Sequence, residues 1–170
     1  MNRTLPIAPL DEAKVLTEQY GAICWRMHRG KVEVLLISSR DTGRWVIPKG
    51  WPMEKRSPSE AAQQEAWEEA GVRGDISDTA IGVFTYVKLL TPKSSRECVV
   101  KVFALRVSEL LDKFPERKER RRKWFTAGKA ARMVLEPGLR KLLLDLGHTL
   151  MAELQEDGQL PIKQPALATA

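Results

Sequence analysis

The chain has 170 residues, of which 43% are hydrophobic and 29% are charged, and its formal net charge is +6. This length is enough for one well-buried core and short for two, and the composition argues against a disordered or membrane-embedded chain. The basic excess favours an anionic partner, and it leaves nucleic acid, acidic phospholipid and polyphosphate open.

The cysteines and the apolar runs exclude further classes of protein. Cys24 and Cys98 are too few for a disulfide framework, and both lie in apolar runs, so we expect buried free thiols. Residues 1–13 lack the continuous apolar segment of a signal peptide, and no stretch reaches the length of a membrane span. We therefore predict a protein of the reducing cytoplasm with no membrane partner.

The hydrophobic pattern predicts strands first, then a helix, more strands and closing helices. Strands are expected at 20–27, 32–38, 45–47, 81–90, 98–107 and 124–125, and helices at 58–70, 127–135 and 139–154. This order indicates one mixed α/β (α+β) domain over residues 18–155. Residues 1–17 form an extended lead-in in this prediction, and residues 156–170 form a mobile tail.

The segment after Gly50 contains clear signals for both ends of a helix. Ser57 suits the N-cap, Pro58 suits the first helical position, and Glu60 completes a capping box with Ser57. Gly71 provides a left-handed end. The helix is therefore predicted with well-defined boundaries.

Three carboxylates lie together on this helix, beside a stripe of small residues that permits close packing on a sheet: Ala62, Ala66 and Ala70. Glu65, Glu68 and Glu69 share an arc of roughly 100°. Like charges four residues apart cost a helix about 0.2–0.5 kcal/mol, and the C-terminal half of a helix disfavours anions. One interpretation is a solvated acidic face. The other is a Mg²⁺ site, because carboxylates and the carbonyls of the Gly50 loop are the oxygen ligands that this ion binds.

Gly50, followed by Gln64-Glu65-Ala66-Trp67-Glu68-Glu69-Ala70-Gly71-Val72, resembles the Nudix box, in which a glycine precedes Arg-Glu-x-x-Glu-Glu-x-Gly-apolar. The spacing fits without a gap. The resemblance implies the Nudix fold, a mixed β-sheet sandwiched between helices, and hydrolysis of a phosphoric anhydride with Mg²⁺, or Mn²⁺ as the alternative. It also implies that Glu65, Glu68 and Glu69 are the catalytic metal ligands and that the Gly50 carbonyl adds a ligand.

Two positions depart from the family pattern. Arg56 stands where the family has Glu, and Gln64 stands where it has Arg. In the family these two residues support the junction between loop and helix through an ion pair, and both halves of that pair are absent here. Two alternatives remain for this junction: Arg56 pairs with Glu60, or Glu54 takes over part of the lost supporting role.

Further stretches resemble one branch of the family, the diphosphoinositol polyphosphate phosphohydrolases. They are Leu35-Leu36-Ile37-Ser38-Ser39-Arg40, Arg44-Trp45-Val46-Ile47-Pro48-Lys49-Gly50 and Arg120-Arg121-Arg122-Lys123-Trp124-Phe125. The likeness covers roughly residues 18–136. Pro48-Lys49-Gly50 also resembles the diadenosine polyphosphate hydrolases, and Lys49 departs from the glycine usual in the inositol enzymes.

A dense basic run precedes Trp124 and consists of Arg117, Lys118, Arg120, Arg121, Arg122 and Lys123. It forms either a solvated face or a phosphate-binding site. The resemblance matches Arg120 to a phosphate-binding arginine and places Arg40 in a Ser-Ser-Arg segment, and Lys49 can reach the same site from its loop. We therefore expect Arg40, Lys49 and Arg120 to bind substrate. A nucleic-acid partner is not favoured, because no recognition motif or interleaved aromatic residues accompany the run.

Together these patterns predict a Mg²⁺-dependent pyrophosphohydrolase for a small, highly charged polyphosphate, either nucleoside-diphosphate-linked or a diphosphoinositol polyphosphate. Water attacks phosphorus, and Glu65, Glu68 or a loop carboxylate such as Glu97 accepts its proton; the sequence leaves the base open. The alternative is a catalytically weak Nudix-fold sensor for a polyphosphate or nucleotide, which Arg56 and Gln64 support. The pattern does not distinguish a monomer from a dimer.

Overall fold

The computed structural model describes residues 16–158, so the predicted lead-in and tail lie almost entirely outside the described residues. The elements follow one another as β1 (Thr17–His28), β2 (Lys31–Ser38), β3 (Trp45–Val46), β4 (Lys49–Gly50), α1 (Pro58–Ala70), β5 (Val72–Ile76), β6 (Gly82–Thr91), β7 (Ser94–Leu110), β8 (Arg122–Thr126), α2 (Ala127–Met133) and α3 (Pro137–Glu156). This is the predicted order of strands, helix, strands and helices.

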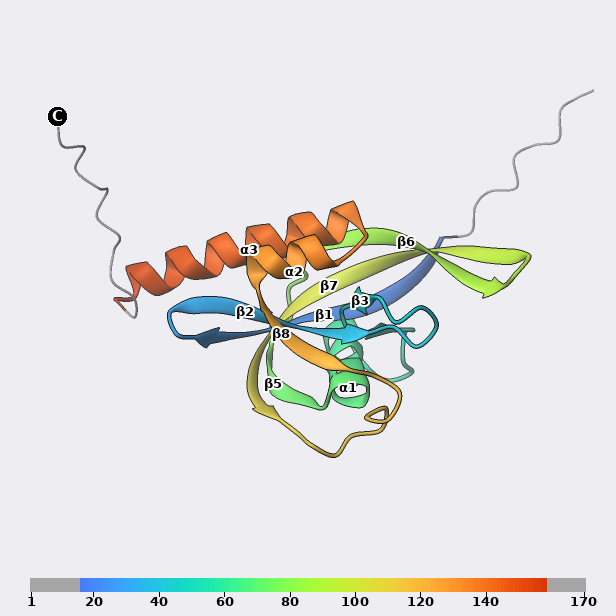
Figure 1. Ribbon diagram of the computed structural model, residues 1–170, viewed down its shortest axis with the longest axis horizontal. Coiled ribbons are helices and arrows are strands. Elements are labelled where there is room, and N and C mark those ends of the chain that lie inside the picture. The colour runs from blue at the N-terminus through green and yellow to red at the C-terminus, as the bar shows by residue number, and fades with distance from the viewer. Residues whose placement is uncertain (1–15, 159–170) are drawn as a thin grey trace, which may run out of the picture.

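One mixed sheet forms the centre of the molecule (Figure 1). Its main path is β3-β2-β1-β7-β5, and β4, β6 and β8 pair with β1, β7 and β2 respectively. β1 and β2 form the predicted hairpin, and β1 runs parallel to β7 with Tyr20 opposite Lys101. All the other pairings are antiparallel. The sheet therefore brings the N-terminal strand against residues about 80 positions further along the chain.

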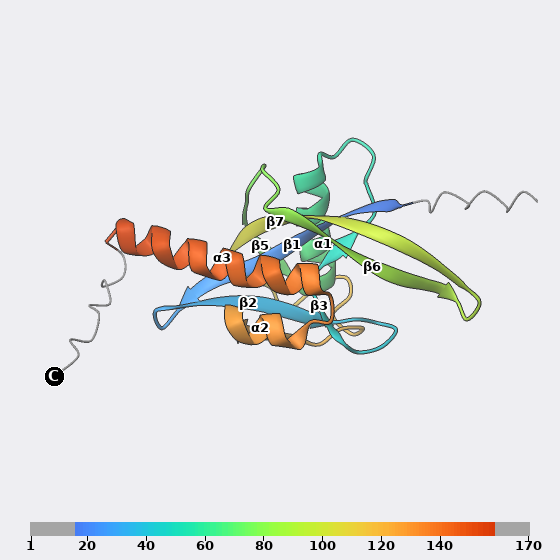
Figure 2. The same cartoon turned by 90° about the horizontal axis from the view of Figure 1, so that it is seen from above.

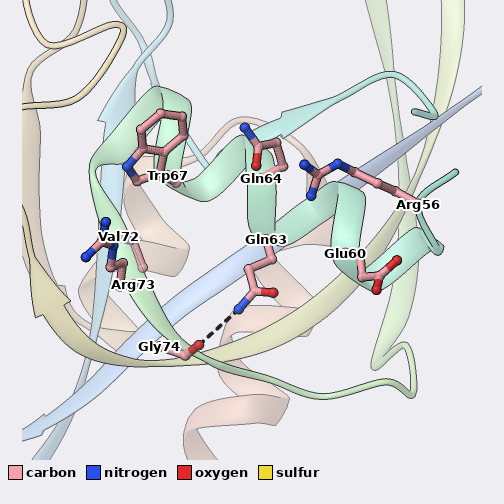
Figure 3. A pocket seen from close by; sticks show the side chains of 8 residues that line it. All are labelled: Arg56, Glu60, Gln63, Gln64, Trp67, Val72, Arg73 and Gly74. Atoms are coloured by element: carbon pink, nitrogen blue, oxygen red, sulfur yellow. Dashed lines mark hydrogen bonds between the residues drawn. The ribbon is translucent and has the colours of Figure 1, made fainter. Parts of the chain in front are cut away.

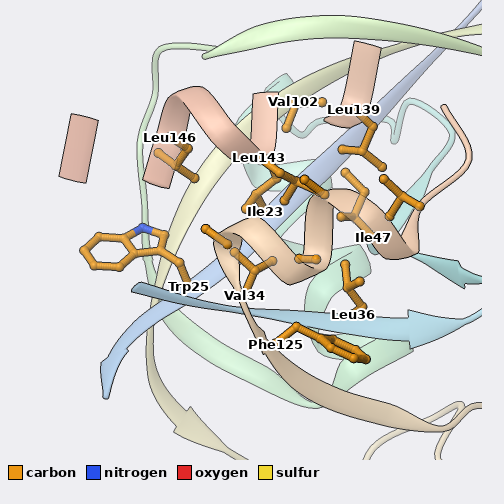
Figure 4. Packing of buried hydrophobic residues seen from close by; sticks show 14 of the residues in the cluster. Ile23, Trp25, Val34, Leu36, Ile47, Val102, Phe125, Leu139, Leu143 and Leu146 are labelled. Atoms are coloured by element: carbon orange, nitrogen blue, oxygen red, sulfur yellow. The ribbon is translucent and has the colours of Figure 1, made fainter. Parts of the chain in front are cut away.

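Helices cover both faces of this sheet, α1 on one side and α2 with α3 on the other (Figures 1 and 2). Figure 4 shows the core beneath α2 and α3, where Ile23, Val34 and Leu143 are fully buried. On the α1 face, the alanines of the small-residue stripe pack against the other sides of the same strands. Alternate residues of β1 thus serve two cores, as the period of a strand requires.

The α1 boundaries and the cysteines agree with the sequence. The Ser57 hydroxyl accepts from the Glu60 backbone N–H at 3.2 Å, and the Glu60 carboxylate accepts from the Ser57 N–H at 2.7 Å. Gly71 ends the helix at φ 67° and ψ 29°, a conformation that a residue with a Cβ adopts at a cost. Cys24 and Cys98 are buried free thiols, as predicted.

The short and irregular strands differ from the prediction. β4 has only two residues and exists because Tyr20 and Gly21 pair with them. β5 contains Gly74 and an aspartate, which are poor strand formers, and its pairing with β7 outweighs that local preference. β7 is longer than predicted at both ends, since β6 and β5 hold its two halves.

Replacing the helix cap should measure how much α1 depends on it. Ser57→Ala removes the hydroxyl acceptor, so we expect a loss of about 1 kcal/mol in the free energy of unfolding. Urea denaturation followed by circular dichroism gives that value. Ser95→Ala, on the exposed end of β7, is the matched control. Equal stabilities of the two variants would show that the capping box contributes nothing.

Candidate functional site

Gly50 and Glu65 meet where the short strand β4 passes under helix α1. β4 is held in place by its pairing with β1, and the alanine stripe brings α1 close to the same strands. A Cβ on Gly50 would lie 1.9 Å from Glu65 Oε1, so only glycine leaves room for this carboxylate. The structure thus brings together two residues of the predicted site that are fifteen positions apart in the sequence.

Glu69 lies deeper in the same place, with only 7% of its surface exposed. Its Oε1 forms an ion pair with Arg120 Nη2 at 3.1 Å, and its Oε2 accepts from the Lys49 backbone N–H at 3.3 Å. Arg120 also forms an ion pair with Glu116 and donates to the Ser38 carbonyl. Two of the predicted substrate-binding residues, Lys49 and Arg120, therefore contact a predicted metal carboxylate.

Glu68 has a different environment. Its Oε1 accepts from the Gln64 amide at 2.7 Å, and its backbone carbonyl accepts from the Glu116 N–H at 3.0 Å. Across residues 16–158, no three His, Cys, Asp or Glu side chains are gathered closely enough to hold a metal ion as they stand. Glu65 and Glu69 are gathered at Gly50, while Glu68 points to Gln64.

Burial changes the protonation of the two inner carboxyls. It raises the pKa of Glu65 to about 7, and the charges of Glu68 and Glu116 act in the same direction. Burial also raises the pKa of Glu69 to about 7, against the opposing effect of Arg120 and Lys49. Burial lowers the pKa of Lys49, which Glu69 partly offsets. These are buried charges that compensate one another only in part.

A cleft of about 610 Å³ opens beside these residues. Glu69, Arg40, Lys49 and Arg120 line it together, so all three predicted substrate-binding residues share one cavity. Apolar and aromatic groups from β6 and the α2–α3 junction form part of its walls: Tyr86, Val87, Leu89, Leu135 and Pro137. The cleft thus presents cations beside an apolar surface.

The rest of the basic run does not form one patch. Arg121 lies over the Trp45 ring, Arg122 donates to the Ala70 carbonyl at the end of α1, and Lys123 lies over Phe125. Arg117 and Lys118 are exposed in the preceding turns. Of the run, only Arg120 lines the cleft.

Some residues of the site carried no signal in the sequence. Glu116 forms ion pairs with both Arg40 (3.0 Å) and Arg120 (3.5 Å), and it comes from a loop without a motif. Glu136, 8% exposed, forms an ion pair with Arg44 at 2.7 Å on the cleft wall. Glu97, a candidate proton acceptor, lies within β7 opposite Val87 rather than in a loop, and it does not line the cleft.

The two positions that depart from the family pattern share a second, open hollow of about 390 Å³ on the outer side of α1 (Figure 3). Arg56 and Gln64 line it with Trp67 and Gln63. Within residues 16–158, Arg56 has no carboxylate within ion-pair distance, and the Glu60 carboxylate is held by the helix cap. The alternative of a direct ion pair between Arg56 and Glu60 is therefore not realised, although the charge of Arg56 helps the cap to lower the pKa of Glu60.

Several known proteins are similar to this chain in sequence. Nudix hydrolase 12, mitochondrial, of Arabidopsis thaliana is 38% identical over 103 residues, which cover 59% of this chain and 51% of that protein. Diphosphoinositol polyphosphate phosphohydrolase 3-alpha of Mus musculus is 34% identical over 105 residues, covering 61% of this chain and 60% of the relative. The chain therefore spans about half to three fifths of the length of these relatives.

Solved structures with a similar fold include a nucleotide hydrolase. An Ap4A hydrolase of C. elegans has a TM-score of 0.61 at 18% identity, covering 80% of this chain and 99% of its own, so it shares the fold.

Names of relatives include mitochondrial and chloroplastic forms, so a cytoplasmic location stays a prediction. Among the residues that the structure describes, no helix is long and apolar enough to cross a bilayer.

A match to a protein-family domain shows which family the chain belongs to. The NUDIX domain family matches residues 17–146, which run from the start of β1 into α3 and include the whole carboxylate helix. The matched region contains Gly50, Glu65 and Glu69, which the fold brings together. The chain therefore belongs to the Nudix family and has the Nudix fold, a mixed sheet between helices.

Proposed function

We propose that this protein is a Mg²⁺-dependent pyrophosphohydrolase that cleaves the P–O–P bond of a small, highly charged polyphosphate. The observation that carries this proposal is the meeting of Glu65 and Glu69 near the Gly50 backbone, beside a cleft that Glu69 lines together with five cationic side chains. Family membership and the names of the relatives support the reaction class.

The donor set fits a hard divalent cation. The buried carboxylate of Glu69, the half-buried carboxylate of Glu65 and a backbone loop supply oxygen atoms, which Mg²⁺ and Mn²⁺ prefer. The raised pKa values of Glu65 and Glu69 indicate negative charge that the protein alone compensates incompletely. We propose Glu65, Glu68, Glu69 and the Gly50 carbonyl as ligands, with Glu68 held by Gln64 through Oε1 and contributing its other oxygen, Oε2. The bound metal would supply charge for the phosphate oxygens and a more acidic water.

The chain's own residues then have distinct roles. The charges of Arg120 and Lys49 partly offset that of Glu69 in the metal-free protein, and once the metal takes over that role both side chains are available to phosphate oxygens. Arg40 is 56% exposed at the rim, where it can contact the far end of a long substrate. Glu65 and Glu68 are the candidates for the proton acceptor, and the geometry does not favour Glu97.

The substrate class follows from the same cleft. Its cations suit the phosphates of a diphosphoinositol polyphosphate or of a nucleoside-diphosphate-linked compound such as a diadenosine polyphosphate. The apolar wall of Tyr86, Leu135 and Pro137 suits a nucleoside better than a fully phosphorylated ring. We therefore place dinucleoside polyphosphates first and diphosphoinositol polyphosphates second.

A catalytically weak sensor is the second candidate. Glu68 accepts a hydrogen bond from Gln64, and Glu69 forms an ion pair with Arg120. These two contacts favour a domain that binds polyphosphate without efficient turnover. An assay of phosphate release with Mg²⁺, on diadenosine polyphosphates and diphosphoinositol phosphates, separates the two. Tight binding of either compound with no release would support the sensor.

Removing one carboxylate charge tests the proposed metal site. Glu69→Gln should lower turnover by at least about 10²-fold with the fold intact, because a metal ligand loses its charge. Glu65→Gln and Glu68→Gln should behave similarly. Steady-state kinetics at saturating Mg²⁺ measures the effect, with Glu153→Gln on the exposed side of α3 as the control. Near-normal rates in all three variants would place the metal elsewhere.

The two raised pKa values predict how the stability of the metal-free protein depends on pH. Glu65 and Glu69 have a pKa of about 7 in the folded protein against an ordinary value of 4.5, so the folded state holds more protons between these limits. Their contribution to stability therefore falls as pH rises from about 4.5 to about 7 and is constant above that. Metal binding, which displaces these protons, should strengthen over the same range.

Urea denaturation in EDTA between pH 5 and pH 8 measures this effect. The free energy of unfolding of Glu65→Gln, relative to the unmodified protein, should increase as pH rises to about 7 and then level off. Glu109→Gln, from the exposed Arg73–Glu109 pair, should show no such trend. A difference between Glu65→Gln and the unmodified protein that does not vary with pH would contradict the assignment.

Substrates of different length test the role of Arg120. Arg120→Ala should raise KM most for the longest polyphosphates, by roughly ten- to a hundred-fold, which corresponds to about 1.5–3 kcal/mol for one charge-assisted hydrogen bond. ADP-ribose should be affected far less, because it does not reach as far. High salt should shrink the difference. Lys118→Ala, exposed in the same run, is the control, and an equal effect on short and long substrates would give Arg120 a purely structural role.

A further inference from the structure

The three carboxylates of α1 are held by three different kinds of partner. Glu65 packs on the Gly50 backbone, and Glu69 is bound by the Arg120 guanidinium and a backbone N–H. Glu68 is bound by the side-chain amide of Gln64, which is a neutral donor. Of the three, Glu68 is therefore the carboxylate whose side-chain partner carries no charge.

The contact between Gln64 and Glu68 is well suited to fix a side chain. The two residues are four positions apart on one helix face, where side chains meet, and the distance between amide nitrogen and carboxylate oxygen is 2.7 Å. The backbone of Glu68 is also anchored, because its carbonyl accepts from the Glu116 N–H. Within residues 16–158, no cation lies within ion-pair distance of the Glu68 carboxylate.

The surroundings of Gln64 explain why a neutral donor stands here. Arg56 lines the same hollow and has no carboxylate within ion-pair distance among the described residues (Figure 3). An arginine at position 64 would add a second cation beside it and would offset the charge of Glu68. A glutamine keeps the hydrogen bond and avoids both effects.

We propose that Gln64 is a positioning residue, which holds Oε1 of the Glu68 carboxylate in place while leaving Oε2 and the negative charge for the metal. This inference rests on the proposed function, since Glu68 is assigned there as a metal ligand. The departure from the family pattern at position 64 then has a physical role, because the neutral amide preserves both the place and the charge of the carboxylate.

The hydrogen bond can be tested in the metal-free protein by NMR of the side-chain amides. The Gln64 amide protons should be shifted downfield and protected from exchange, and Glu68→Ala should abolish both effects. Gln63, whose amide donates instead to the Gly74 carbonyl at 3.0 Å, should keep its signals in that variant. Gln64 signals that do not respond to Glu68→Ala would overturn the proposal.

The consequence for the site can be tested by titration with Mn²⁺ alone, using its electron paramagnetic resonance signal. Gln64→Ala should weaken Mn²⁺ binding by about two- to tenfold, as expected for one hydrogen bond, with an unchanged melting temperature. In a Glu68→Ala background the same substitution should have no further effect. Gln63→Ala, on the same helix and in the same hollow, should bind Mn²⁺ normally.

The outcomes separate this inference from the proposed function. Normal Mn²⁺ binding by Gln64→Ala, or an equal loss with and without Glu68, would overturn the role of Gln64 and leave the metal site standing. No Mn²⁺ binding by the unmodified protein would overturn the proposed function, and the role of Gln64 with it. Gln64→Arg should also weaken binding, and Arg56→Glu combined with Gln64→Arg should restore it, because the added guanidinium then has a partner other than Glu68.

Discussion

A buried carboxylate, Glu69, is the group on which the arrangement of the site depends. It is 7% exposed, and a carboxylate so far from water is costly unless cations or hydrogen-bond donors surround it. Arg120 from the segment before β8 and the Lys49 backbone from β4 meet that requirement. One charge thus ties together a helix, a short strand and a distant loop.

The alanine stripe of α1 is the cause of this burial. Side chains of one carbon let the helix approach the sheet closely, and that approach carries the neighbouring glutamates into a region of low dielectric constant. The pKa values of Glu65 and Glu69 rise to about 7 as a result. Close packing and perturbed acidity therefore have a common origin, and such sites are frequently functional.

The loop that precedes β8 links the carboxylates to the cleft. Glu116 donates its backbone N–H to the end of α1 and binds Arg120 and Arg40 through its carboxylate. The cations that line the cleft are thus partly neutralised in the metal-free protein. A ligand with several phosphates, together with a metal, would exchange these internal pairs for stronger external ones, which is why we expect cofactor and substrate to bind in a mutually supportive way.

The sequence by itself determined the order of elements, both ends of α1 and the identity of the carboxylates. These are local properties: caps, a left-handed glycine and a period of 3.6 residues are all written within a few positions. The tertiary structure decided which carboxylate meets which partner. Glu65 against Gly50, Glu69 against Arg120 and Glu68 against Gln64 depend on how the helix, sheet and loop pack. It also decided that β4 and β5 are strands at all, because two residues, or five with a glycine among them, are extended only when a neighbouring strand pairs with them.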